Sequence, residues 1–267
     1  MTRNEKLLLH ATKAGRGVEI GPSYNPVAPK CGGYNVVTID TVDKPGLVAK
    51  YRSQNVDVSQ IEDVDYVWRG ESYASLIRPP HDFDWIVASH VIEHTPDLIG
   101  FLNDCASILA PHGVLCLAIP DKRYCFDILR PVTALGRIID AFAAKTRMHT
   151  PGSITEYMLN AVSRNGEITW GEAAEGELRF LCPIEQVTAH LNGALRDGLT
   201  VDVHAWCFTP SSFRLLVHDL NALGLVGLHE RAFFPTVGAE FYVTLAKGGA
   251  GAPLDRRELA EKARREC

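Results

Sequence analysis

The chain has 267 residues, of which 46% are hydrophobic and 22% charged, and its formal net charge is −5. This ordinary globular composition argues against nucleic acid or an anionic membrane surface as an obligatory partner. The seven cysteines show no CxxC pair and no regular spacing, which argues against a disulfide framework and a zinc site. Residues 1–6 are polar and lack the apolar segment of a signal peptide. We expect a soluble, cytoplasmic protein.

Residues 1–120 alternate short apolar strands with helices. Each strand is an apolar or β-branched run that ends in a polar turn, and each helix shows apolar spacing of three and four residues. This alternation predicts a parallel sheet with both faces covered. The expected strands are 17–20, 35–40, 63–68, 84–89 and 114–119, and the expected helices are 4–14, 43–51, 71–78 and 96–109.

The alternation breaks after residue 120. Helical patterns at 133–145 and 184–196, with loops around 151–152 and 166–176, precede the next expected strand at 201–205. We interpret 121–204 as a largely helical insertion that covers the carboxyl edge of the sheet as a substrate lid. The core, 1–120 and 205–247, then resumes with a helix at 210–223 and strands at 226–232 and 240–246. The tail, 248–267, is expected to be a solvated helix or disordered.

Four segments resemble those of class I S-adenosylmethionine-dependent methyltransferases. They are the strand and turn at 18–25, Asp40 at the end of the second strand, DWIVASHVIEH at 84–94 and LAPHGVL at 109–115. The third is similar to the family's acid, apolar strand and V-L-E-H motif, and the fourth to its L-x-P-G-G-x-L motif. The resemblance implies an α/β, Rossmann-like, seven-stranded, mostly parallel sheet with helices on both faces. It also implies S-adenosylmethionine as the cofactor.

The loop after the first strand departs from the family's glycine-rich pattern. Gly21 is followed by Pro22, Ser23, Tyr24, Asn25 and Pro26, so the backbone has one glycine with which to approach a ligand closely. We expect backbone N–H groups around Gly21, and the side chains of Ser23 or Asn25, to contact the donor's carboxylate, with Pro22 as a further cofactor contact.

Further cofactor contacts are expected at the ends of strands. Asp40 is suited to the ribose hydroxyls, with an ordinary turn acid as the alternative. Glu19 is expected to hold the ammonium group, unless it forms a strand-end ion pair. Trp68, beside Arg69, either stacks on adenine or belongs to the core. Ser89 and His90 are expected to contact the methionine moiety.

The catalytic candidates follow the fourth and fifth strands and the insertion. Asp121 could accept a proton and Arg123 could clamp an anion, with Tyr124 beside them. His204 is a second candidate base, next to Trp206 as a substrate contact. His94 either shapes the pocket floor or acts as a base. Although His90 and His94 are four residues apart, the H-E-x-x-H order is absent, and we predict no metal site.

These observations predict methyl transfer to oxygen or nitrogen of a small-molecule or sugar/glycan acceptor. A homodimer is left open. One alternative is an NAD(P)-dependent oxidoreductase, but the GxGxxG motif that it requires is absent. Another is a non-catalytic methyltransferase-like scaffold, which would have no need of the polar loops at 121–124 and 202–206.

Overall fold

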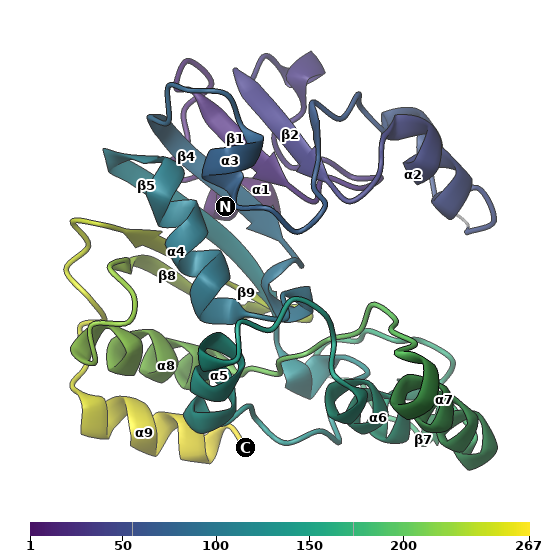
Figure 1. Cartoon of the computed structure of the whole chain (residues 1–267). Coiled ribbons are helices and arrows are strands. Elements are labelled where there is room, and N and C mark those ends of the chain that lie inside the picture. Colours follow the sequence, from purple (N-terminus) through teal and green to yellow (C-terminus); the bar gives the residue numbers. More distant parts are fainter. Residues whose placement is uncertain (55, 173) are drawn as a thin grey trace.

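A seven-stranded sheet forms the centre of the computed structural model, which describes residues 1–54, 56–172 and 174–267 (Figure 1). The strand order is β3-β2-β1-β4-β5-β9-β8. β9 pairs antiparallel with both β5 and β8, and the other pairings are parallel. The strands are β1 Gly17–Ile20, β2 Val36–Asp40, β3 Tyr66–Val67, β4 Phe83–Ser89, β5 Leu109–Pro120, β8 His229–Val237 and β9 Glu240–Ala246. The predicted Rossmann-like class is confirmed.

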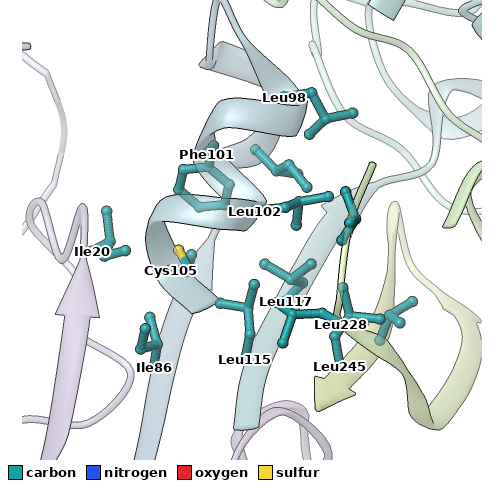
Figure 2. Packing of buried hydrophobic residues seen from close by; sticks show 14 of the residues in the cluster. Ile20, Ile86, Leu98, Phe101, Leu102, Cys105, Leu115, Leu117, Leu228 and Leu245 are labelled. Carbon is teal, nitrogen blue, oxygen red and sulfur yellow. The ribbon is translucent and has the colours of Figure 1, made fainter. Parts of the chain in front are cut away.

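Helices cover both faces of this sheet. On one face, α4 (Leu98–Ile108) packs apolar side chains spaced three and four residues apart against β4, β5 and β9, as Figure 2 shows for Phe101 and Leu102. On the other face, α1 (Arg3–Leu7) packs Leu7 against a cluster that includes Trp85. The remaining helices are α2 Lys44–Tyr51, α3 Tyr73–Leu76, α5 Leu135–Ala143, α6 Pro151–Asn160, α7 Ile184–Asp197, α8 Pro210–Ala222 and α9 Arg256–Arg265.

The segment between β5 and α8 differs in detail from the sequence prediction. Residues 151–152 begin α6 instead of forming a loop, because Thr150 caps the helix and Pro151 occupies its first position. Two three-residue strands, β6 (Val162–Arg164) and β7 (Leu178–Phe180), form a separate antiparallel pair. Of the predicted loop at 166–176, residue 173 lies outside the described residues. The predicted strand at 201–205 is wrong, since this stretch is an irregular connection.

Several helices and strands also begin or end at other residues than the sequence predicts. The first helix ends at residue 7 instead of 14, β3 contains only residues 66–67 of the predicted 63–68, and β5 begins at 109.

The C-terminal part of the chain packs on the core, because α9 contacts α8 and buries Leu259 and Ala263. Among the described residues, no helix has the length and apolar character needed to cross a membrane.

The sheet changes its winding direction between β1 and β4. From β1 the chain continues to β2 and β3 on one side, whereas β4 leads to β5 on the other. The parallel pairing of these strands brings Ile20, Asp40, Ser89 and Pro120 to one edge of the sheet. In open α/β sheets this carboxyl edge, at the point of reversal, is where ligands bind.

Candidate active site

Gly21 occupies a position that only glycine fits well. Its φ is +67°, in the left-handed region, and its backbone N–H donates to the carbonyl of Ile39. A Cβ atom there would lie 2.8 Å from Cγ2 of Val91. The loop after β1 therefore presses its backbone against the segment that follows β4.

The rest of this loop is held by two carboxylates. Glu19, 3% exposed, accepts hydrogen bonds from the backbone N–H of Val27 at 2.6 Å and of Ala28 at 3.0 Å. Burial raises the pKa of Glu19 to about 7, although these two bonds act in the opposite direction. The backbone N–H of Ser23 donates to Oδ2 of Asp40 at 3.1 Å. These N–H groups are thus bonded within the chain, and an ammonium-binding role for Glu19 stays a prediction.

Other predicted residues of the loop differ in exposure. Pro22 is buried, whereas Asn25 is exposed. The Ser23 hydroxyl donates to the phenol oxygen of Tyr51 on α2 at 2.7 Å. The loop is therefore fixed to α2 on one side and to Asp40 on the other.

Asp40 and Trp68 lie side by side at the ends of β2 and β3. The backbone N–H of Trp68 donates to the carbonyl of Asp40 at 2.8 Å, and the indole N–H donates to the carbonyl of Glu71. Trp68 is half-buried and packs against the main core, while Arg69 is exposed. The Asp40 carboxylate accepts from Ser23 and from the backbone of Thr41, which leaves lone pairs for further donors.

At the end of β4, Ser89 and His90 join a charged network. Arg3 donates to the Ser89 hydroxyl at 2.7 Å and pairs with Glu240, and Glu240 also bonds Nε2 of His90 at 2.7 Å. Burial lowers the pKa of His90, but Glu240 and Glu93 outweigh it and raise the pKa. His90 has a φ of +54°, which is strained for a residue with a side chain. The network fixes α1 and β9 to the end of β4.

Asp121 and Arg123, after β5, bind each other. Asp121 is fully buried, and its carboxylate accepts from the Arg123 guanidinium and from the Thr236 hydroxyl, both at 2.6 Å. The guanidinium lies 5.1 Å from the ring centroid of Tyr124, which is half-buried. In this arrangement the two charges satisfy each other, and their predicted catalytic and substrate roles stay untested.

A second group of predicted residues converges beside the end of β4. The rings of His94 and His204 meet edge to face with centroids 4.7 Å apart. Glu93, the residue before His94, is 1% exposed, and His204 Nε2 lies 3.8 Å from its Oε1. The connection before α8 is held here because the backbone N–H of Ala205 donates to the carbonyl of Glu93 at 2.7 Å. We call Glu93, His94 and His204 the Glu–His cluster.

Each histidine of the Glu–His cluster is oriented by a carboxylate through Nδ1. His204 bonds Asp127 at 2.5 Å, and His94 bonds Asp202 at 2.8 Å. Burial lowers the pKa of His94, but the bond to Asp202 and the charge of Glu93 outweigh it and raise the pKa. Burial alone would raise the pKa of Asp127, yet His204 and Arg130 lower it overall. Sequence reasoning did not find Glu93, Asp127 or Asp202; for Glu93, the only signal was its place in the motif after β4.

Trp206 lies in the core instead of facing an open pocket. It is buried within the main hydrophobic cluster, and its indole N–H donates to the carbonyl of Thr95 at 2.6 Å. Together with the bond from Ala205, this contact ties the connection before α8 to the segment after β4. Two surface hollows of about 410 Å³ each lie elsewhere, at α1 and between α8 and β8.

The strand order and the carboxyl-edge site define a Rossmann-like enzyme that binds a nucleoside. The chain belongs to the methyltransferase domain family, whose model matches residues 3–166, more than half of the chain. It is a class I S-adenosylmethionine-dependent methyltransferase, as the resemblance implied, and S-adenosylmethionine is its methyl donor. This identification replaces the oxidoreductase alternative.

Solved structures with similar folds include S-adenosylmethionine-dependent methyltransferases from Aquifex aeolicus and Mesorhizobium loti. The first has 12% identity and a TM-score of 0.44, covering 91% of this chain and 88% of that one. The second has 15% identity and a TM-score of 0.44, covering 91% and 97%. Human N-acetylserotonin methyltransferase in complex with S-adenosylmethionine has 12% identity and a TM-score of 0.41, covering 92% and 52%. No curated protein sequence matches the chain.

The residues at the carboxyl edge fit the methyl donor. Gly21 lets the backbone approach closely, and Asp40 at the end of β2 offers carboxylate oxygens suited to a ribose diol. Trp68 is half-buried and bonds the backbone of Asp40, and its stacking on adenine stays a prediction. The donor set is thus compatible with a nucleoside that spans the ends of β1, β2 and β4.

Proposed function

We propose that this methyltransferase acts on oxygen or nitrogen of a small-molecule or sugar/glycan acceptor. The observation that carries the proposal is the Glu–His cluster at the end of β4. It places two imidazoles and a buried carboxylate at the edge of the sheet where the donor is expected to bind. The acceptor would bind between this edge and the segment 121–204, which we propose is its lid.

The chemistry of the Glu–His cluster suits an acceptor that must lose a proton. When bound, S-adenosylmethionine supplies a methyl group on an electrophilic sulfonium. Transfer of that methyl group to oxygen or nitrogen would require the acceptor atom to give up its proton. Asp127 and Asp202 fix the orientation of His204 and His94, so the imidazoles can meet the acceptor in a defined geometry.

The surroundings of His204 favour a compact acceptor. Phe126 lies 4.6 Å from its ring and Tyr157 of α6 lies 6.4 Å away, and the two aromatic rings meet edge to face. Apolar walls with a few polar groups are typical of small-molecule sites. The net charge of −5 also disfavours RNA or DNA as the acceptor.

The proposal is tested by incubating the full chain with methyl-labelled S-adenosylmethionine and a panel of hydroxyl and amine acceptors, including free and glycan-linked sugars. We expect one acceptor class to gain the label, and mass spectrometry of the product to place the methyl group on oxygen or nitrogen. A protein that binds the donor yet labels nothing in the panel would instead support a non-catalytic binding domain. A methyl group found on carbon would also overturn the proposal.

A further inference from the structure

The Glu–His cluster has the composition of a metal site. One ligand atom from each of Glu93, His94 and His204 lies within 4.8 Å of the other two. A cation with bonds of about 2.1 Å needs ligand atoms about 3–3.5 Å apart, so the side chains would have to close by about 1 Å. His94 is half-buried and is the last residue of a single 3-10 turn, Ile92–His94, so its side chain has room for such an adjustment.

The environment of Glu93 is separate evidence for a bound cation, because its buried carboxylate lacks a hydrogen-bond partner among the described residues. Its side chain is 1% exposed, and neither carboxylate oxygen has a hydrogen-bond partner among the described residues. The nearest ring nitrogens, His90 Nδ1 at 3.6 Å and His204 Nε2 at 3.8 Å, lie beyond hydrogen-bond distance. Buried carboxylates are ordinarily hydrogen-bonded, paired with a cation or bound to a metal.

The histidines are also prepared as ligands. Because Asp127 and Asp202 bond the Nδ1 atoms of His204 and His94, Nε2 is the nitrogen of each ring that remains for a ligand. A carboxylate on the far nitrogen of a histidine is the usual outer contact of a metal-binding imidazole, because it fixes the tautomer and raises the basicity of the nitrogen that binds.

We propose that Glu93, His94 and His204 bind one divalent transition-metal cation, of the Zn²⁺, Co²⁺ or Ni²⁺ class. Two imidazoles and one carboxylate favour these ions over Mg²⁺ and Ca²⁺, which prefer oxygen ligands. Three protein ligands leave at least one coordination position open, as in catalytic metal sites. The sequence predicted no metal because His204 comes from the far end of the 121–204 segment, so no local spacing reveals the site.

The catalytic consequence rests on the proposed function. At the open position the cation would bind the acceptor's oxygen and lower the pKa of its hydroxyl, whose proton then leaves to water. His204 would act in this case as a ligand that positions the acceptor, and not as the proton acceptor itself. Cation binding does not depend on this step and is measured without donor or acceptor.

The experiment uses the full chain after treatment with a chelator, titrated with ZnCl₂ by calorimetry and with CoCl₂ by visible absorption. We expect one saturable site, with far weaker binding of MgCl₂. Glu93→Gln and His94→Gln should each weaken Zn²⁺ binding at least about 10-fold, and Asp127→Asn about 10- to 100-fold. His112→Gln is the matched control, since His112 is bonded to Asp84 at the opposite edge of the sheet.

Circular dichroism of each variant verifies its fold, and the half-buried His94 provides a variant that leaves the core intact. The absence of a saturable site in the wild type would overturn the inference, as would Zn²⁺ binding that Glu93→Gln and His94→Gln leave unchanged. Methyl transfer that is equally fast with and without chelator would refute the metal's catalytic part while leaving the proposed function. A protein that binds Zn²⁺ but methylates nothing would refute the function alone.

Discussion

Nδ1 of His204 lies 2.5 Å from Oδ2 of Asp127, and the two side chains are 9% and 2% exposed. This contact joins the loop after β5 to the connection before α8 across the Glu–His cluster. We therefore expect Asp127→Asn to lower kcat about 10- to 100-fold, because the imidazole loses the carboxylate that orients it. The Kd for S-adenosylmethionine should stay unchanged.

Steady-state kinetics and calorimetry measure these two quantities. Asp127 also pairs with Arg130, so the variant will be less stable, and the assay is run well below its unfolding temperature. A normal kcat in the folded variant would show that the contact is structural only.

Replacement of Gly21 by alanine tests the loop after β1. The φ of +67° and the contact with Val91 should lower the free energy of unfolding by about 1–2 kcal/mol and raise the Kd for S-adenosylmethionine. Gly33→Ala is the matched control, since Gly33 has a φ of +84° but no atom near its missing Cβ. Chemical denaturation should show a loss of stability in both variants. Calorimetry should show weaker binding of S-adenosylmethionine only in Gly21→Ala. Equal donor affinities of the two variants would argue against a role of the loop in binding.

The ionised Glu240 carboxylate should contribute to the free energy of unfolding, and this contribution should be lost at low pH. Burial raises the pKa of Glu240, but hydrogen bonds from His90 and Arg3 outweigh this effect and lower the pKa from 4.5 to about 2. The stabilisation is therefore complete above pH 4.5 and is lost as the pH falls toward 2, and it amounts to at most about 3 kcal/mol.

Urea unfolding of the wild type and of Glu240→Gln at several pH values measures this contribution. The difference between their free energies of unfolding should be largest near pH 6 and shrink below pH 4.5. A difference that is independent of pH would mean that the charge of Glu240 does not contribute to stability.

Arg214 and Glu230 form a buried pair between α8 and β8, with both nitrogen–oxygen distances at 2.8 Å. Arg214→Met should cost about 3–5 kcal/mol, because it leaves the Glu230 carboxylate buried without a partner. The double variant Arg214→Met/Glu230→Leu should recover most of this loss. If urea unfolding showed the double variant to be less stable than Arg214→Met, the pair itself would be the stabilising element.

The parallel half of the sheet could be predicted from sequence because its signals are local. The strand expected at 84–89 is found as Phe83–Ser89, since an apolar run between polar turns marks both ends. The stretch 201–205 alternates apolar and polar residues like a strand, but its last N–H donates to the carbonyl of Glu93 instead of to a neighbouring strand. β6 and β7 are three residues long, too short for any periodicity to appear.

The site was predictable only as far as strand ends define it. Asp40 and His90 could be placed at the carboxyl edge because parallel strands end together there. The mutual pairing of Asp121 and Arg123 and the carboxylate partner of His204 depend on contacts between distant segments. Such contacts cannot be predicted from the spacing of residues in a single sequence. That the Glu93 carboxylate is buried without a hydrogen-bond partner among the described residues is likewise visible only in the structure.

The most direct test of the Glu–His cluster as the place of methyl transfer is a single-turnover measurement with labelled S-adenosylmethionine and the identified acceptor, comparing wild type, His204→Gln and His112→Gln. We predict that His204→Gln lowers the transfer rate at least about 100-fold with an unchanged Kd for the donor, whether His204 takes the acceptor's proton or holds a cation that lowers the pKa of the acceptor's hydroxyl. His112→Gln should react like the wild type. Transfer by His204→Gln at the wild-type rate would contradict the account.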